Sequence, residues 1–155
     1  MIITKETDYA LRILRVLSNE QKYTMAEISA NEMIPTSFAY KILRKLDKAG
    51  IVQVTRGFLG GCQLNKDLAG VSLYDLMVAI GEKGVLSACM APAYSCPWRE
   101  RYGTCNVHNS LSTLQRNMIA ELNAISLKYL LSGELCPHGK EHPCNMRTEF
   151  TQKAT

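Results

Sequence analysis

Three cysteines in the middle of the chain are spaced closely enough to act together. Cys89, Cys96 and Cys105 lie within 17 residues, in the pattern Cys-x6-Cys-x8-Cys. The sequence begins with charged residues where a secretion signal would be hydrophobic, so we expect its six cysteines in a reducing compartment. Metal binding or thiol redox chemistry is therefore the expected use of these thiols, rather than a disulfide framework.

A second group of potential metal ligands lies near the end of the sequence. Its pattern is Cys-x-His-x3-His-x-Cys, formed by Cys136, His138, His142 and Cys144. Gly139 disfavours a helix that would place both histidines on one face, and the one-residue gaps are shorter than the usual zinc spacing of about two to four residues. Two interpretations stay open for residues 133–155: a second metal site, or a disordered Cys/His-rich tail without metal.

Composition places the chain among ordinary globular proteins. Apolar residues make up 46% of the sequence and charged residues 21%, a balance that excludes disordered and fibrous proteins. No apolar run approaches the ~18–20 residues of a membrane-spanning helix. We therefore expect a soluble, cytoplasmic protein with no membrane partner. No nucleophile–base pair, phosphate-binding loop or cofactor fingerprint is present, so an enzyme is not expected.

The first fifty residues have the pattern of three short helices. Apolar residues recur on one face over residues 5–18. Thr24 and Glu27 have the spacing of a capping box that starts a second helix. Pro35 suits the first turn of a third helix, and Gly50 suits its end. Two short helices joined by a tight connection, the second one basic, make a helix-turn-helix candidate.

A β-hairpin is predicted after the third helix. The pattern changes to a strand at Ile51–Val54, a glycine-bearing turn at Arg56–Gly61 and a second strand at Cys62–Leu64. The predicted fold class is therefore mainly α with a small β-hairpin, arranged as a winged helix-turn-helix domain over residues 1–82. In such a domain the third helix enters the major groove of DNA, and the hairpin reaches the backbone or the minor groove.

Positive charge is concentrated on this third helix and hairpin. The net charge of the chain is +4, and five basic residues against one acidic residue fall between Phe38 and Arg56. Because cations neutralise phosphates, this concentration favours double-stranded DNA as a partner. The alternative is an ordinary solvated helix face.

Two further segments follow the winged-helix region. Residues 83–105 carry the three thiols and show no convincing period, which is typical of a functional loop, and we interpret them as a sensor loop that bound metal would order. Apolar residues recur with a helical period from Val107 to Tyr129, which predicts one continuous helix over residues 106–132. Its length favours a dimerisation helix, because a symmetric regulator must pair two DNA-reading units. The alternative is packing against its own domain.

Several segments taken together resemble one bacterial family. The stretches TKETDYALRILRVL, IPTSFAYKILRKLDKAGIV, TRGFLGGCQL, VSLYDLMVAIGE and CNVHNSLSTLQ are similar, in order and spacing, to winged-helix transcription regulators of the IscR/NsrR/RirA family, over about residues 1–132. The resemblance implies a homodimeric, DNA-binding regulator. It also implies an iron–sulfur cluster, which several members bind through three loop cysteines to sense cluster supply, iron, redox state or nitric oxide.

The resemblance assigns the cluster ligands to Cys89, Cys96 and Cys105. Thiolates suit such a cluster because a soft, anionic sulfur stabilises iron bridged by sulfide. The family offers two candidates for a fourth ligand, Asp8, which can come from the other subunit, and His108. The cysteine spacing here is wider than in the known cluster binders, so both [2Fe-2S] and [4Fe-4S] stay open. The alternative is a set of free thiols in a loop without a cluster.

The resemblance also indicates DNA-contacting residues on the third helix and the hairpin turn. They are Thr36, Ser37, Tyr40, Lys41, Arg44, Lys45 and Arg56. Ser37, Tyr40 and Lys41 match the family's base-reading face. Tyr40 stands where some relatives have a glutamate that discriminates between operators. The three remaining cations suit phosphate or minor-groove contacts, which give affinity without base preference.

These features predict a homodimeric repressor whose affinity for a DNA operator is controlled by an iron–sulfur cluster. One alternative keeps the DNA binding and replaces the cluster by thiol oxidation, a small molecule or a partner protein. An alternative of another class is an iron–sulfur carrier or assembly factor, in which the helix-turn-helix is incidental. Salt-dependent binding to duplex DNA separates regulator from carrier, because a regulator releases counterions as it neutralises phosphates.

Overall fold

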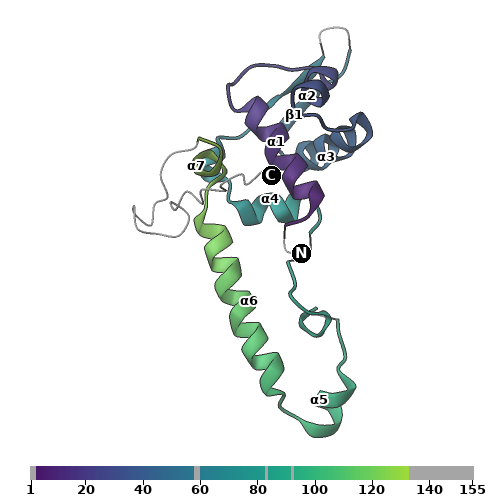
Figure 1. The fold of residues 1–155 in the computed structure, drawn as a ribbon, viewed down its shortest axis with the longest axis vertical. Helices are drawn as coiled ribbons and strands as arrows, with labels where there is room; N and C mark the ends of the chain where they lie inside the picture. Colours follow the sequence, from purple (N-terminus) through teal and green to yellow (C-terminus); the bar gives the residue numbers. More distant parts are fainter. Residues whose placement is uncertain (1–2, 58–59, 83, 92, 133–155) are drawn as a thin grey trace, which may run out of the picture.

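The computed structural model describes residues 3–57, 60–82, 84–91 and 93–132. Its elements are α1 (Lys5–Leu17), α2 (Met25–Asn31), α3 (Thr36–Lys48), β1 (Val52–Thr55), β2 (Gly61–Leu64), the 3-10 turn η1 (Leu68–Gly70), α4 (Leu73–Ala79), the 3-10 turn η2 (Ala88–Met90), α5 (Pro97–Tyr102), α6 (Asn106–Ala124) and α7 (Leu127–Ser132). Helices α1 to α4, the hairpin and α7 form a body, from which α6 extends toward α5 (Figure 1). The prediction of a mainly helical fold with a small hairpin is confirmed.

Local sequence signals start and end the first three helices. Thr4 caps α1 by accepting from the backbone of Glu6 and Thr7, and Thr24 and Glu27 form a complete capping box on α2. Helices α1 and α3 each bury one apolar stripe in a shared core, which leaves the other face of α3 in solvent. The three predicted helices are therefore confirmed.

The hairpin is held against the body on both of its edges. Strands β1 and β2 pair antiparallel, with Val54 opposite Cys62. On the outer edge of β2, Cys62 and Tyr23 exchange two backbone hydrogen bonds, of 2.7 and 3.0 Å. On the outer edge of β1, the carboxylate of Asp47 in α3 accepts from the backbone N–H of Val54 at 3.0 Å. These bonds fix the hairpin beside α3.

The predicted continuous helix over residues 106–132 is wrong, because the structure has two helices there. Helix α6 ends where Ile125 adopts an extended backbone, with φ −92° and ψ 108°. The carbonyl of Ile125 accepts from Leu73, and Leu127 donates to Val71 at 2.8 Å, so the chain pairs briefly with the start of α4. Leu127, the first residue of α7, is then fully buried in the core. Burial of this leucine and two inter-segment hydrogen bonds compensate for the interrupted helix.

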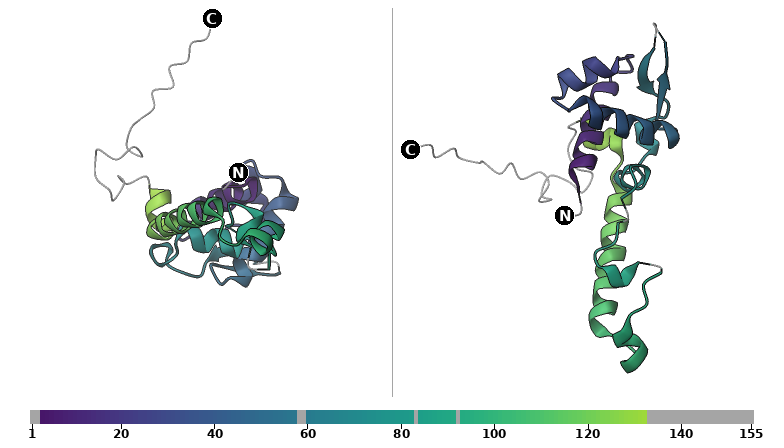
Figure 2. Two further views of the ribbon diagram at one scale, coloured as in Figure 1. Left: turned by 90° about the horizontal axis from the view of Figure 1, so that it is seen from below. Right: turned by 90° about the vertical axis from the view of Figure 1, so that its right-hand side faces the viewer.

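The thiol-bearing segment contains more structure than the sequence indicated. The turn η2 packs against α6, and α5 starts with Pro97 at a position that needs no backbone donor. The backbone N–H of Leu86 donates to the side chain of Gln115 at 3.0 Å, which ties the beginning of the segment to α6. Two views show α5 at the far end of α6, away from the hairpin (Figures 1 and 2).

Candidate functional site

The outward face of α3 carries most of the residues predicted to contact DNA. Thr36, Ser37, Tyr40, Lys41 and Arg44 are all exposed. The guanidinium of Arg44 lies over the ring of Tyr40, 5.8 Å from its centroid, so the two side chains share one surface. The buried face of the same helix packs on α1 and the hairpin, which fixes how this row is presented.

A groove of about 730 Å³ runs between α3 and the hairpin. Arg44 and Lys48 line it from the helix, and Arg56 lines it from the hairpin turn. Asp47 also lines the groove, but its carboxylate is engaged by the backbone of Val54. The groove therefore offers cations from two separate elements, an arrangement that suits the phosphate backbone of a duplex.

Lys48 lies in this groove although it is absent from the predicted set. It is exposed in the last turn of α3. Its spacing of four residues from Arg44 could have indicated it, because residues four apart share a helix face.

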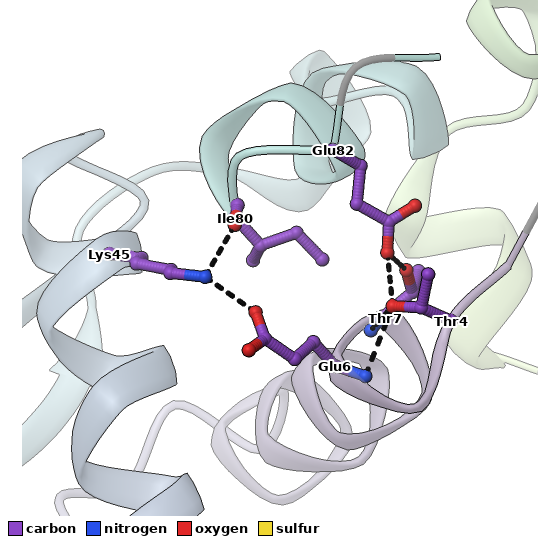
Figure 3. A network of polar contacts seen from close by, with 6 residues as sticks. All are labelled: Thr4, Glu6, Thr7, Lys45, Ile80 and Glu82. Carbon is purple, nitrogen blue, oxygen red and sulfur yellow. Dashed lines mark hydrogen bonds and ion pairs between the residues drawn. The ribbon is translucent and has the colours of Figure 1, made fainter. Parts of the chain in front are cut away.

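Lys45 is bonded to other helices of the chain, although it lines one hollow with Lys41, Arg44 and Lys48. Its ammonium donates to the carboxylate of Glu6 in α1 and, at 2.6 Å, to the carbonyl of Ile80 at the end of α4 (Figure 3). One side chain of α3 thus connects three helices. Two of the three N–H donors of the ammonium are thus engaged within the chain, so Lys45 is suited to positioning α3.

A second set of polar contacts lies beside this one. The hydroxyls of Thr4 and Thr7 both donate to the same carboxylate oxygen of Glu82 (Figure 3). Thr7 is fully buried. Glu82 follows α4 and precedes the thiol-bearing segment, so the contacts connect the start of α1 to the beginning of that segment.

The three central thiols occupy three different elements. Cys89 lies on η2 with its sulfur 3.4 Å from the hydroxyl of Ser87. Cys96 directly precedes α5 and makes no side-chain cap bond, whereas Cys105 directly precedes α6 and caps it. All three are free thiols and none is fully buried. Within the described ranges, no three histidine, cysteine, aspartate or glutamate side chains form a group that could hold a metal ion. The donor chemistry fits an iron–sulfur cluster, and the sulfurs are not assembled in advance.

The two candidates for a fourth ligand have different surroundings. The backbone N–H of His108 donates to the sulfur of Cys105 at 3.4 Å, and its Nε2 lies 3.3 Å from the guanidinium of Arg99. Its Nδ1 is buried and makes no hydrogen bond to the described part of the chain. Asp8 lies on α1, in the body, and pairs with Arg12 at 3.0 Å. One chain thus places His108, and not Asp8, next to a thiol.

The remaining cysteines are in other places. Cys62 is buried in β2 at the groove, and burial, together with the nearby Asp47, raises the pKa of its thiol. It serves as a small apolar residue of the core. The predicted second metal site at Cys136, His138, His142 and Cys144 lies outside the described residues.

Comparisons with known proteins agree on one family. Residues 3–133 match the Rrf2 family, described as "Iron-dependent Transcriptional regulator". The protein named rrf2 of Nitratidesulfovibrio vulgaris (strain Hildenborough) is 26% identical over 155 residues, which cover 97% of this chain and 99% of that protein. The HTH-type transcriptional regulator IscR of Vibrio vulnificus (strain YJ016) is 30% identical over 135 residues, which cover 85% of this chain and 78% of that regulator.

A solved structure shares the fold. The crystal structure of the oxidized form of Staphylococcus aureus CymR superposes with a TM-score of 0.63 at 18% sequence identity, and covers 88% of this chain and all of that one. At this identity the likeness concerns the fold alone.

Proposed function

The chain belongs to the Rrf2 family of DNA-binding transcriptional regulators, and from that premise we propose that it is a homodimeric repressor whose operator affinity is set by an iron–sulfur cluster. The groove between α3 and the hairpin is the observation that carries the DNA-binding part, because cations line it from both elements. Three free thiols on one segment support the cluster.

The proposal divides the DNA contacts by side-chain type. Thr36, Ser37, Tyr40 and Lys41 near the start of α3 enter the major groove and read bases. Arg44, Lys48 and Arg56 line the groove beside the hairpin and contact phosphates or the minor groove. Lys45 keeps its contacts with Glu6 and Ile80 and positions α3, which replaces the direct contact predicted from the sequence.

The dimer is proposed to form along α6. No residue of this helix is fully buried in one chain, and Val107 and Leu114 are 67% and 56% exposed. A projecting helix with exposed apolar side chains gains free energy when a second copy covers it. Pairing two copies also gives two recognition helices, which a palindromic operator requires.

The cluster is proposed to be held by Cys89, Cys96 and Cys105. In the occupied state these thiolates would carry a redox-active group that iron shortage, oxidants or nitric oxide can remove. His108, whose backbone N–H donates to the sulfur of Cys105, is the fourth ligand proposed from the same chain, whereas Asp8 would come from the partner subunit. Because the three cysteines lie on η2 and directly before α5 and α6, the segment would rearrange to bring their sulfurs together.

The polar contacts drawn in Figure 3 link Glu82 to α1 and α1 to α3. Glu82, just before the segment, accepts from Thr4 and Thr7 at the start of α1. Glu6, also on α1, accepts from Lys45 of α3. A displacement of the segment that moves Glu82 would therefore act on α1 and, through Glu6, on the recognition helix. This would couple the state of the thiols to the DNA-contacting face.

A second candidate keeps the DNA binding and uses thiol oxidation as the signal. The observation in its favour is that the three sulfurs lie on separate elements and form no ready metal-binding group within the described ranges. Oxidation is recorded for a protein of the same fold, since one solved structure of Staphylococcus aureus CymR is of its oxidized form. The two candidates differ in whether iron and sulfide accompany the protein.

The deciding experiment measures iron and acid-labile sulfide per protomer, with the visible spectrum, in full-length protein purified without oxygen. We expect equal iron and sulfide in the wild type and loss of both in Cys89→Ala. Cys62→Ala is the matched control and should keep both, because its thiol is buried in β2. Absence of iron and sulfide from the wild type would overturn the cluster and leave thiol oxidation.

DNA binding is tested separately by the salt dependence of affinity for duplex DNA. Binding should weaken steeply as salt rises, because phosphate neutralisation releases counterions. Arg56→Ala should weaken binding to all duplexes alike and reduce the salt slope by about one. A change in preference for one operator with unaltered non-specific binding would contradict the role given to Arg56.

A further inference from the structure

Met33, in the turn between α2 and α3, has an unusual backbone for its side chain. Its φ is +51°, in the left-handed region that favours glycine, and it is 82% exposed. The turn is a Schellman motif: Met33 donates to the carbonyl of Ala30, and Ile34 donates to that of Ser29. Met33 therefore occupies the position after the helix cap, where glycine is the usual residue.

The same chain uses glycine at the equivalent position of two other helices. Gly50 after α3 and Gly81 after α4 have φ of +68° and +87° and make the same pair of hydrogen bonds with their neighbours. Of the three motifs, the one at the end of α2 is the one with a large side chain at the left-handed position. The strain of a left-handed methionine is not offset by burial, since the side chain lies in solvent.

The residues beside Met33 hold its side chain outward. Glu32 is buried, and both of its carboxylate oxygens accept from the guanidinium of Arg15 in α1. Ile34 is buried in the core on the other side. With both neighbours fixed inward, the turn presents an apolar side chain three residues before the exposed start of α3.

We propose that Met33 is an apolar specificity contact to the operator, with the C5-methyl group of a thymine as its ligand. The inference rests on the proposed function, in which the start of α3 enters the major groove. Thymine methyls line that groove and are recognised by apolar side chains. The exposed cations beside α3 cannot supply such a contact, and Met33 adds a wholly apolar side chain to the polar and aromatic ones proposed to read bases.

The test uses full-length protein and a duplex selected from a random library by the wild type. Met33→Gly should bind this duplex about fivefold or more weakly. Its melting temperature should be unchanged or higher, because glycine relieves the left-handed strain. Its salt slope should match the wild type, since no phosphate contact is lost. Met33→Leu keeps an apolar side chain and should bind within about twofold of the wild type.

Replacement of single thymines by deoxyuridine identifies the ligand. At one thymine position per half-site, the replacement should weaken binding of the wild type to the duplex. The same replacement should leave the affinity of Met33→Gly unchanged. Glu20→Gly is the matched control, because Glu20 also has a left-handed backbone, with φ +63°, in the turn after α1. It should keep full DNA affinity.

Two results would overturn the inference while the proposed function stands. One is equal affinity of Met33→Gly and the wild type for the selected duplex. The other is weaker binding by Met33→Gly when no deoxyuridine replacement distinguishes the two proteins. If the wild type shows no salt-dependent binding to duplex DNA, the proposed function fails and the inference fails with it.

Discussion

The cations of α3 have different environments although they are close in sequence. Lys45 donates to Glu6 and Ile80, whereas Arg44 and Lys48 line the groove beside the hairpin. Long cations in solvent supply affinity for phosphates, and a cation held by a carboxylate and a carbonyl supplies position. Mutation of Arg44 or Lys48 should therefore lower the affinity for DNA, whereas mutation of Lys45 should lower the stability of the fold.

Lys48→Ala should weaken binding to all duplexes alike and reduce the salt slope by about one, because one phosphate contact is lost. Lys128→Ala is the matched control, since Lys128 is also exposed, but lies on α7. Fluorescence anisotropy over a salt series measures both effects. Equal salt slopes for the two variants would place Lys48 outside the interface.

Cys62 should react more slowly with iodoacetamide than Cys89, Cys96 and Cys105 in metal-free, reduced protein. Burial raises the pKa of its thiol, so less of the reactive thiolate is present near neutral pH, and access is blocked as well. Timed alkylation followed by peptide mass spectrometry gives the order. Labelling of Cys62 before the other three would contradict its placement in β2.

At the scale of elements, the junction between α6 and α7 contributes most to the difference between prediction and structure. Leu127→Ala should lower the free energy of unfolding by about 2–5 kcal/mol, because a fully buried leucine leaves a cavity. Leu130→Ala, on the same helix but 40% exposed, should cost clearly less. Urea unfolding compares them, and equal losses would mean that α7 does not dock through Leu127.

The cap of α4 should give stability a dependence on pH. Asp75 accepts from the backbone N–H and the hydroxyl of Ser72, and these bonds lower the pKa of its carboxyl. A lowered pKa in the folded state contributes stability above the unfolded value of about 3.9, and this contribution is lost as the pH falls through the folded value.

Asp75→Asn should therefore unfold at lower urea than the wild type at neutral pH, and the gap should close below about pH 4. Unfolding curves of both proteins between pH 7 and about pH 3 measure this. A gap that stays constant over the whole range would show that the carboxylate does not contribute through its charge.

On the scale of the whole molecule, the hairpin and α5 lie at opposite ends of one chain (Figure 2). A signal that begins near α5 must therefore travel along α6 and Glu82, or pass through a partner subunit. The exposed apolar side chains of α6 make a second copy the expected partner.

Leu114→Glu should convert the proposed dimer to a monomer, because it places a charge in the proposed apolar interface. Asn109→Glu is the matched control, since Asn109 is exposed on the opposite face of α6. Sedimentation velocity at several concentrations gives the association state, and the monomer should also bind a palindromic duplex more weakly. A dimer that survives Leu114→Glu would place the interface elsewhere.

Local signals in the sequence were sufficient for α1 to α3 and for the hairpin. Thr24 with Glu27, Gly50, and the change of period after the third helix predicted its helices and hairpin, because caps, glycines and periodicity act within a few residues. The spacing of Cys89, Cys96 and Cys105 likewise indicated the segment that could do chemistry.

Contacts between distant segments decided the remaining features. The end of α6 depends on backbone pairing with Val71 and Leu73, and the position of Lys45 depends on Glu6 and Ile80, all far away in the sequence. The pair of the buried Glu32 with Arg15 likewise joins α1 to the end of α2. The sequence by itself determined the first three helices, the hairpin and which thiols are available, since those depend on neighbours along the chain. Only tertiary packing decided where a helix stops and which cation is left for DNA.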